Sequence, residues 1–232
     1  VLELGLPVSG AVAIVGVSQG GHATLAAAAR HARYAPELDV RAFAAVAPSS
    51  VFLEQWRPYV DVSGPHQVFN ALVAYAWSAH YGHVGAPIWA PARRDDIDAI
   101  MAERCLLTWF DVPTLWDVLG SDPAQIFDPA YIQALRAADF TDYPFLDEGF
   151  RANRLGPYAQ TAPLRIYQGD ADTVVLEAHT RALVDALRAG GVDVEYEVVP
   201  GAGHIDLAFG FVADAQARTE QSIAWVMAHL RP

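Results

Sequence analysis

The chain has 232 residues, of which 53% are hydrophobic and 18% are charged, so it holds enough apolar material for one sizeable core. All fifteen basic residues are Arg, and the absence of Lys excludes Schiff-base and pyridoxal-phosphate chemistry, Ser-Lys dyads, and the P-loop and kinase lysines. A net charge of -12 argues against a nucleic-acid partner, because phosphate binding depends on clustered basic side chains.

No segment predicts a transmembrane helix or a signal peptide. The longest stretch without charged side chains, 62–92, is interrupted by proline and polar residues. Its apolar centre, 68–79, is shorter than the about 20 residues that a bilayer-spanning helix needs. The sequence opens at Val1 without the basic and apolar segments typical of a signal peptide. The single Cys105 cannot form an internal disulfide or a Cys-rich zinc site.

The first fifty residues predict a strand, a helix and a second strand. Residues 11–17 form a continuous β-branched apolar run, typical of a strand buried on both faces in a parallel sheet. The Ala-rich segment 22–34 has a basic end and stops before Pro36, as a helix does. Residues 41–47 are a second short apolar run. This βαβ order predicts parallel strands joined by a right-handed crossover.

Residues 51–150 have a different composition. They hold seventeen of the 25 aromatic residues and five of the six Trp, between helix-like patches and proline breaks. We interpret them as a mostly helical insertion. The aromatic side chains form either the insertion's own core or an apolar lid, and the sequence leaves both interpretations open.

Alternation of strand and helix resumes near residue 164. A short apolar run at 164–168 predicts a strand, and 177–189 predicts a helix ended by Gly190-Gly191. Residues 192–199 alternate between apolar and acidic side chains, which is typical of an edge strand. A last helix is expected at 212–230.

The predicted fold class is therefore α/β. We expect a parallel sheet of about four strands with helices on both faces and a helical cap insertion. The division along the chain is a core part at 1–50, the insertion at 51–150, and a second core part at 151–232.

The most informative motif is Gly16-Val17-Ser18-Gln19-Gly20, which matches G-x-S-x-G and lies between the first strand and its helix. In that context the serine sits on a strained turn with its hydroxyl at the carboxyl edge of the sheet. We expect Gly16 and Gly20 to be required because a Cβ at either position would obstruct the approach of strand and helix. The backbone N–H of Gln19 opens the helix and would point at a developing oxyanion.

A serine nucleophile needs a base, and His204 is the best candidate because it follows a strand in a Gly-rich loop. His22 is too close to the turn, and other histidines fall on expected helices. His80 and His83 have a spacing that could bind a metal on a helix, but no carboxylate pair lies near them in the sequence, so no metal is expected.

Two carboxylates compete for the role of the acid that orients the base. Asp170 and Asp172 both follow the strand at 164–168, and residues two apart in an extended chain share a side. Asp172 is preferred because it stands directly before Thr173-Val174-Val175. Asp170 is then expected to cap the loop.

Taken in chain order, the GVSQGG turn, YAPELDV, the aromatic insertion, YQGDADTVV and PGAGH resemble the α/β-hydrolase superfamily. Within it, GVSQGGHATLAAA followed by YAPELDVRAFAAVAPS is similar to the secretory lipase family, the bacterial and fungal relatives of the lipase A type. The resemblance implies a Ser18, Asp172 and His204 triad under a helical cap, with Gln19 as an oxyanion donor. It also implies secretion, no cofactor, small-molecule ester or acylglycerol substrates, and contact with a lipid interface through the cap.

The sequence departs from this superfamily at its start. About four strands normally precede the serine turn, and one of their loops gives the second oxyanion N–H, whereas seventeen residues precede Ser18 here. We therefore expect either a C-terminal fragment of a longer hydrolase or the product of a truncated reading frame, with residues 11–17 left as an apolar edge strand. A serine ester hydrolase is the first functional hypothesis. A serine peptidase of the same fold and a non-catalytic remnant are the alternatives.

Overall fold

A computed structural model describes residues 10–104, 111–209 and 213–231. The chain divides into two compact units: unit 1 is Val1–Ser50 with Leu155–Pro232, and unit 2 is Val51–Arg154. Cys105, the first nine residues, and residue 212, where we expected the last helix to begin, lie outside the described residues.

Unit 1 is built on a four-stranded sheet in the order β1-β2-β3-β4, and every neighbouring pair of strands is parallel. The strands are β1 (Ala11–Val17), β2 (Asp39–Val46), β3 (Leu164–Gly169) and β4 (Val194–Val199). The helices are α1 (Gln19–Tyr34), α9 (Glu177–Ala189), α10 (His204–Phe209) and α11 (Ala213–Leu230). The predicted α/β class is confirmed.

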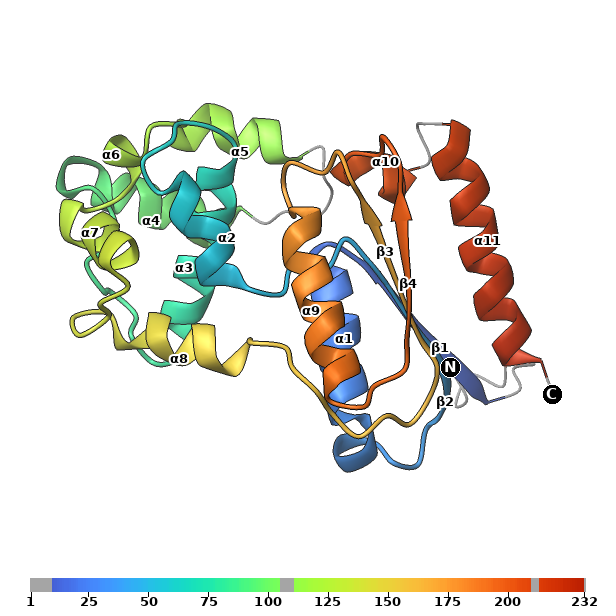
Figure 1. Cartoon of the computed structure of the whole chain (residues 1–232). Helices are drawn as coiled ribbons and strands as arrows, with labels where there is room; N and C mark the ends of the chain where they lie inside the picture. The colour runs from blue at the N-terminus through green and yellow to red at the C-terminus, as the bar shows by residue number, and fades with distance from the viewer. Residues whose placement is uncertain (1–9, 105–110, 210–212, 232) are drawn as a thin grey trace. The chain divides into compact units, whose positions relative to one another are not determined.

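Helices cover both faces of this sheet (Figure 1). On one face, α1 and α9 bury Leu25 and Val184 against strand residues such as Phe43 and Ile166. On the other face α11 packs against β1 and β2. Both faces of the central strands are therefore apolar, and this explains why the sequence of β2 is a nearly continuous hydrophobic run.

Strand β1 differs from its prediction in one respect. It was expected to be buried on both faces, but its side chains are only partly buried and Val15 is 54% exposed. The reason is its place at one edge of the described sheet, where it pairs with β2 alone. The edge position agrees with the expectation that residues 11–17 form an apolar edge strand.

Unit 2 is helical in its described residues. Its α-helices are α2 (Phe52–Trp56), α3 (His66–His80), α4 (Arg94–Glu103), α5 (Asp111–Leu119), α6 (Pro123–Ile126), α7 (Pro129–Ala137) and α8 (Pro144–Ala152), with short 3-10 turns η2 (Arg57–Tyr59) and η3 (Pro91–Arg93). Proline is the first residue of α6, α7 and α8, where its missing N–H costs nothing. Several of the expected proline breaks are therefore helix starts.

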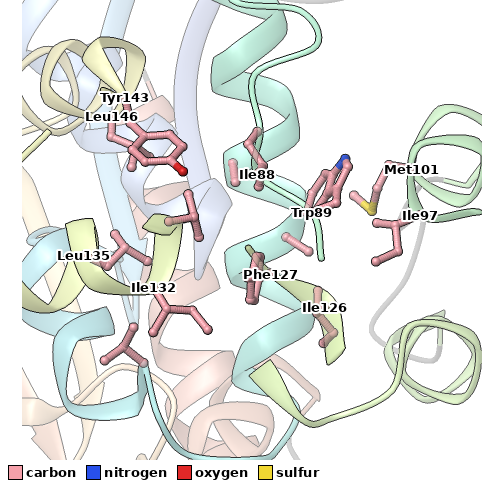
Figure 2. Close-up of a cluster of buried hydrophobic side chains, with 14 of the residues drawn as sticks. Ile88, Trp89, Ile97, Met101, Ile126, Phe127, Ile132, Leu135, Tyr143 and Leu146 are labelled. Atoms are coloured by element: carbon pink, nitrogen blue, oxygen red, sulfur yellow. The ribbon is translucent and has the colours of Figure 1, made fainter. Parts of the chain in front are cut away.

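Aromatic and aliphatic side chains of unit 2 together form a core of its own (Figure 2). Trp89, Phe127 and Tyr131 are almost fully buried, and the rings of Phe127 and Tyr131 stack with their centroids 5.1 Å apart. The hydroxyl of Tyr131 donates to Asn70 Oδ1 at 2.8 Å, so these two polar side chains are paired with each other inside the core. Of the two interpretations of the aromatic insertion, packing within unit 2 accounts for these side chains.

The strand order sets where chemistry can occur in unit 1. Because all four strands run in parallel, the loops after β1, β3 and β4 meet at one edge of the sheet. Those loops carry Ser18, Asp172 and His204. Within the described residues, no helix is both long enough and apolar enough to cross a membrane.

Candidate active site

Ser18 occupies the turn between β1 and α1 in a strained conformation. Its φ of 55° is positive, which is uncommon for a residue with a side chain. The backbone N–H of Ser18 donates to the carbonyl of Val46 at the end of β2, and its carbonyl accepts from the N–H of His22 in α1. These bonds hold the turn between strand and helix, as a nucleophile elbow requires.

The glycines around Ser18 are not equivalent. A Cβ at Gly16 would lie 2.1 Å from the carbonyl oxygen of Gly20, so Gly16 is needed for the close approach of β1 and α1. The same expectation for Gly20 is wrong, because a Cβ there meets no described atom within 4 Å. Gly21 takes that role: its Cβ would lie 2.8 Å from the Val46 carbonyl and 3.1 Å from the Cα of Pro48.

His204 begins α10 and contacts both other candidate residues. Its Nδ1 lies 2.8 Å from Asp172 Oδ2, and its Nε2 lies 2.9 Å from Ser18 Oγ. A carboxylate only accepts hydrogen bonds, so Nδ1 carries the proton and donates to Asp172. In the neutral imidazole with this tautomer, Nε2 carries no proton and can accept the hydrogen of the Ser18 hydroxyl.

The carboxylate of Asp172 is buried and fully hydrogen-bonded, with 0% of the side chain exposed. Oδ1 accepts from the backbone N–H groups of Val174 and Val175 at 2.8 and 2.9 Å. Oδ2 accepts from His204 and from Gln168 Nε2. These four donors give a buried carboxylate the hydrogen-bond partners that it cannot obtain from water.

Asp170 has a different hydrogen-bond partner from Asp172. Its Oδ1 accepts the backbone N–H of Gly201 at 2.6 Å, which ties the loop after β3 to the loop that leads to His204. Asp206 accepts from the N–H of Gly203 at 2.8 Å in the same loop. The structure therefore brings Asp172 to the imidazole and uses Asp170 to hold the loop.

Gln19 is the first residue of α1. Its N–H is one of the four at a helix start that have no partner within the helix, so it is available to a bound group. Its role as an oxyanion donor stays a prediction.

The remaining histidines do not join this group. His22 Nδ1 lies 2.8 Å from the carbonyl of Ser49. His80 ends α3 and His83 follows it, and in the described part of the chain neither belongs to a group of three side chains that could hold a metal ion.

Sequence reasoning missed Gln168 and Thr180. Gln168 is fully buried at the end of β3, and its side chain contacts Asp172, Val175 and Thr180. The available signal was an amide residue two positions after the core residue Ile166 and four after Leu164, on the same side of the strand.

A parallel sheet with helices on both faces, a G-x-S-x-G turn after β1, and the chain order serine, aspartate, histidine define an α/β-hydrolase fold. The sequence profile of the prolyl oligopeptidase family matches residues 116–232, half of the chain, and the chain belongs to this family. The matched part contains Asp172 and His204 but not Ser18.

Solved structures share the fold along nearly the whole chain. A candidate hydrolase from Legionella pneumophila is 22% identical, with a TM-score of 0.77 over 99% of this chain. The rice cell wall degrading esterase LipA from Xanthomonas oryzae is 18% identical, with a TM-score of 0.71 over 98% of this chain. Candida antarctica lipase A is 18% identical, with a TM-score of 0.55 over 91%.

This chain spans only part of those proteins: 59% of the first, 59% of the second and 49% of the lipase. No curated protein matches the sequence.

Proposed function

We propose that the protein is a serine hydrolase that cleaves carboxylic esters through an acyl-enzyme on Ser18. The observation that carries the proposal is the unbroken hydrogen-bonded chain from Ser18 Oγ through His204 to the buried Asp172 carboxylate. A hydroxyl is a weak nucleophile by itself, and this arrangement supplies both a proton acceptor and a group that orients it.

In the proposed reaction, Ser18 Oγ attacks the ester carbonyl carbon and its proton moves to His204 Nε2. Asp172 stabilises the imidazolium that forms, and the N–H of Gln19 donates to the oxyanion. Collapse of the tetrahedral intermediate breaks the bond to the alcohol, which leaves with the proton from Nε2. Water then attacks the acyl-enzyme with His204 as its base, and this releases the acid and restores Ser18.

An ester is preferred over a peptide because likeness to the esterase and the lipase extends over most of the chain, 98% and 91% of it. A serine peptidase is the second candidate, and the match to the prolyl oligopeptidase family favours it. Turnover of p-nitrophenyl esters against peptide p-nitroanilides separates the two. Turnover of the anilides at rates equal to or above those of the esters would favour the peptidase.

Ser18→Ala tests the nucleophile in the complete protein, since the chain spans little more than half of its structural relatives. We expect loss of fluorophosphonate labelling and a fall in kcat on the order of 10⁶, because nothing else can form the acyl-enzyme. Ser63→Ala is the matched control, since Ser63 is exposed in unit 2. Turnover by Ser18→Ala within tenfold of the parent removes Ser18 from the mechanism. Failure of the parent itself to label supports the non-catalytic remnant.

Three expectations that came from the family resemblance remain proposals: that unit 2 is a cap, that it contacts a lipid interface, and that the protein is secreted. The cap is tested by the acyl-chain dependence of turnover, because burial of an acyl chain contributes about 0.8 kcal/mol for each CH₂. A series from acetate to decanoate esters with a flat profile contradicts an acyl site. Binding to phospholipid vesicles and fractionation of the culture medium test the other two.

A further inference from the structure

Gln168 is a buried polar residue that the proposed reaction does not yet use. It lies in β3, where the neighbouring residues Ile166 and Tyr167 are apolar, and 0% of it is exposed. A buried primary amide is costly unless its oxygen and its N–H groups find partners. The hydrogen-bond partners of the Gln168 side chain therefore indicate its role.

Four partners surround the amide of Gln168, and the most distant is the carbonyl oxygen of Gly169, 3.4 Å from Nε2. Its Nε2 donates to Asp172 Oδ2 and to the carbonyl oxygen of Val175, both at 2.9 Å. Its Oε1 accepts from the hydroxyl of Thr180 in α9 at 2.7 Å. The orientation of the amide follows from these partners, because a carboxylate and a carbonyl can only accept and so must face the NH₂ group.

The bond to Asp172 falls on the oxygen that also binds the imidazole. Oδ1 is held by backbone N–H groups of its own loop, whereas Oδ2 receives one donor from His204 and one from Gln168. Gln168 thus links the carboxylate to the rigid strand β3. Without it, His204 is the only side-chain donor to Oδ2 that remains among the described residues, and the other bonds to the carboxylate are the two backbone N–H groups at Oδ1.

We propose that Gln168 is a positioning residue that holds Asp172 Oδ2 in line with His204 Nδ1, and that Thr180 fixes the orientation of the Gln168 amide. The inference rests on the proposed function, because it concerns the acid of the same site. It predicts an effect on kcat that is transmitted through Asp172 and leaves substrate binding unchanged.

Gln168→Met keeps the length of the side chain and removes its donors. In the complete protein we expect kcat for p-nitrophenyl butyrate to fall about 10- to 100-fold, since the lost bond is made to a charged group, with KM within about twofold. We also expect loss of the downfield proton resonance of the bond from His204 to Asp172. Gln160→Met is the matched control: Gln160 also bonds backbone groups, those of Ala162 and Asp193, but it lies before the start of β3, away from the loop that carries Asp172. Its kcat stays at the parental value.

A double-mutant cycle with Asp172→Asn separates positioning from a general loss of structure. If Gln168 acts through Asp172, Gln168→Met lowers kcat by less than about threefold once the carboxylate is gone. Thr180→Val gives a second route if Gln168→Met does not fold, with an expected loss of about three- to tenfold that also disappears in the Asp172→Asn background. Equal losses in both backgrounds, or parental kcat in folded Gln168→Met, overturn the inference.

Ser18→Ala in the same series tells the two failures apart. If Ser18→Ala keeps its turnover, the proposed function fails whatever Gln168 does. If Ser18→Ala is inactive and the cycle is additive, only the positioning role fails.

Discussion

Replacing Gly16 with alanine places a methyl group where unit 1 has no room for it. The Cβ would lie 2.1 and 2.3 Å from the carbonyl oxygen and carbon of Gly20, and 2.7 Å from Thr24 Oγ1. Favourable contacts between heavy atoms begin near about 3.5 Å, so the overlap with the backbone exceeds about 1 Å. Backbone atoms cannot rotate away as a side chain can, and β1 and α1 must therefore separate at the turn that carries Ser18.

The free-energy cost follows from that overlap. Overpacking of well-packed sites costs about 1–3 kcal/mol, and a clash with backbone belongs at the upper end, near about 3 kcal/mol. Gly20→Ala is the matched variant in the same motif. Gly20 lies in the first turn of α1 without a positive φ, and its Cβ meets no described atom within 4 Å. Alanine there should stabilise the protein by about 0.4–1 kcal/mol through the lower entropy of the unfolded chain.

Urea unfolding followed by circular dichroism measures both variants against the parent, and fluorophosphonate labelling reports on the serine. We expect the two midpoints to move in opposite directions, with a difference of about 4 kcal/mol in the free energy of unfolding, and labelling to be lost in Gly16→Ala only. A Gly16→Ala protein as stable as the parent, or a Gly20→Ala protein destabilised by more than about 1 kcal/mol, refutes the steric reasoning.

Three further outcomes test other parts of the fold. Asp170→Asn should keep ester turnover within about threefold of the parent, because an amide oxygen still accepts the N–H of Gly201. A loss of turnover as large as that of Asp172→Asn would assign the role of the acid to Asp170. Tyr131→Phe removes the donor to buried Asn70 and should lower the free energy of unfolding of unit 2 by about 1–3 kcal/mol in urea. Burial lowers the pKa of His66 from its ordinary 6.5, so the unfolded chain binds the proton first and stability falls as the pH drops below that value. His66→Gln should weaken the dependence of the urea midpoint on pH below that value. An unchanged pH dependence would contradict the assignment to His66.

Patterns among neighbouring residues were sufficient to predict the bounds of α9 and the edge position of β4. The helix at Glu177–Ala189 has the expected bounds, because an amphipathic stripe and Gly190-Gly191 mark its end within a few residues. The alternation in β4 identified an edge strand, and the strand lies at an edge of the sheet. These signals depend on neighbours in the sequence, and no long-range information was needed.

The meeting of Ser18 with His204, 186 residues away, was also within reach of the sequence. Parallel strands deliver their following loops to one edge, so three polar residues that each follow a strand are expected to converge there. The choice of Asp172 over Asp170 needed more than this rule. Both carboxylates are at the right edge, and the structure distinguishes them: Asp172 accepts from His204, whereas Asp170 accepts from the N–H of Gly201 and holds the loop.

The errors at Gly20 and Gln168 share a physical cause. Whether a Cβ at position 20 or 21 meets the end of β2 depends on how α1 turns after Ser18, and a one-residue step along a helix rotates a side chain by about 100°. Likewise, the sequence around Gln168 does not specify which atoms the amide of this side chain contacts. Its partners Val175 and Thr180 lie seven and twelve residues further on, across a turn and into α9. Such residues act through a second side chain, so their role becomes visible only when distances between non-neighbouring atoms are known.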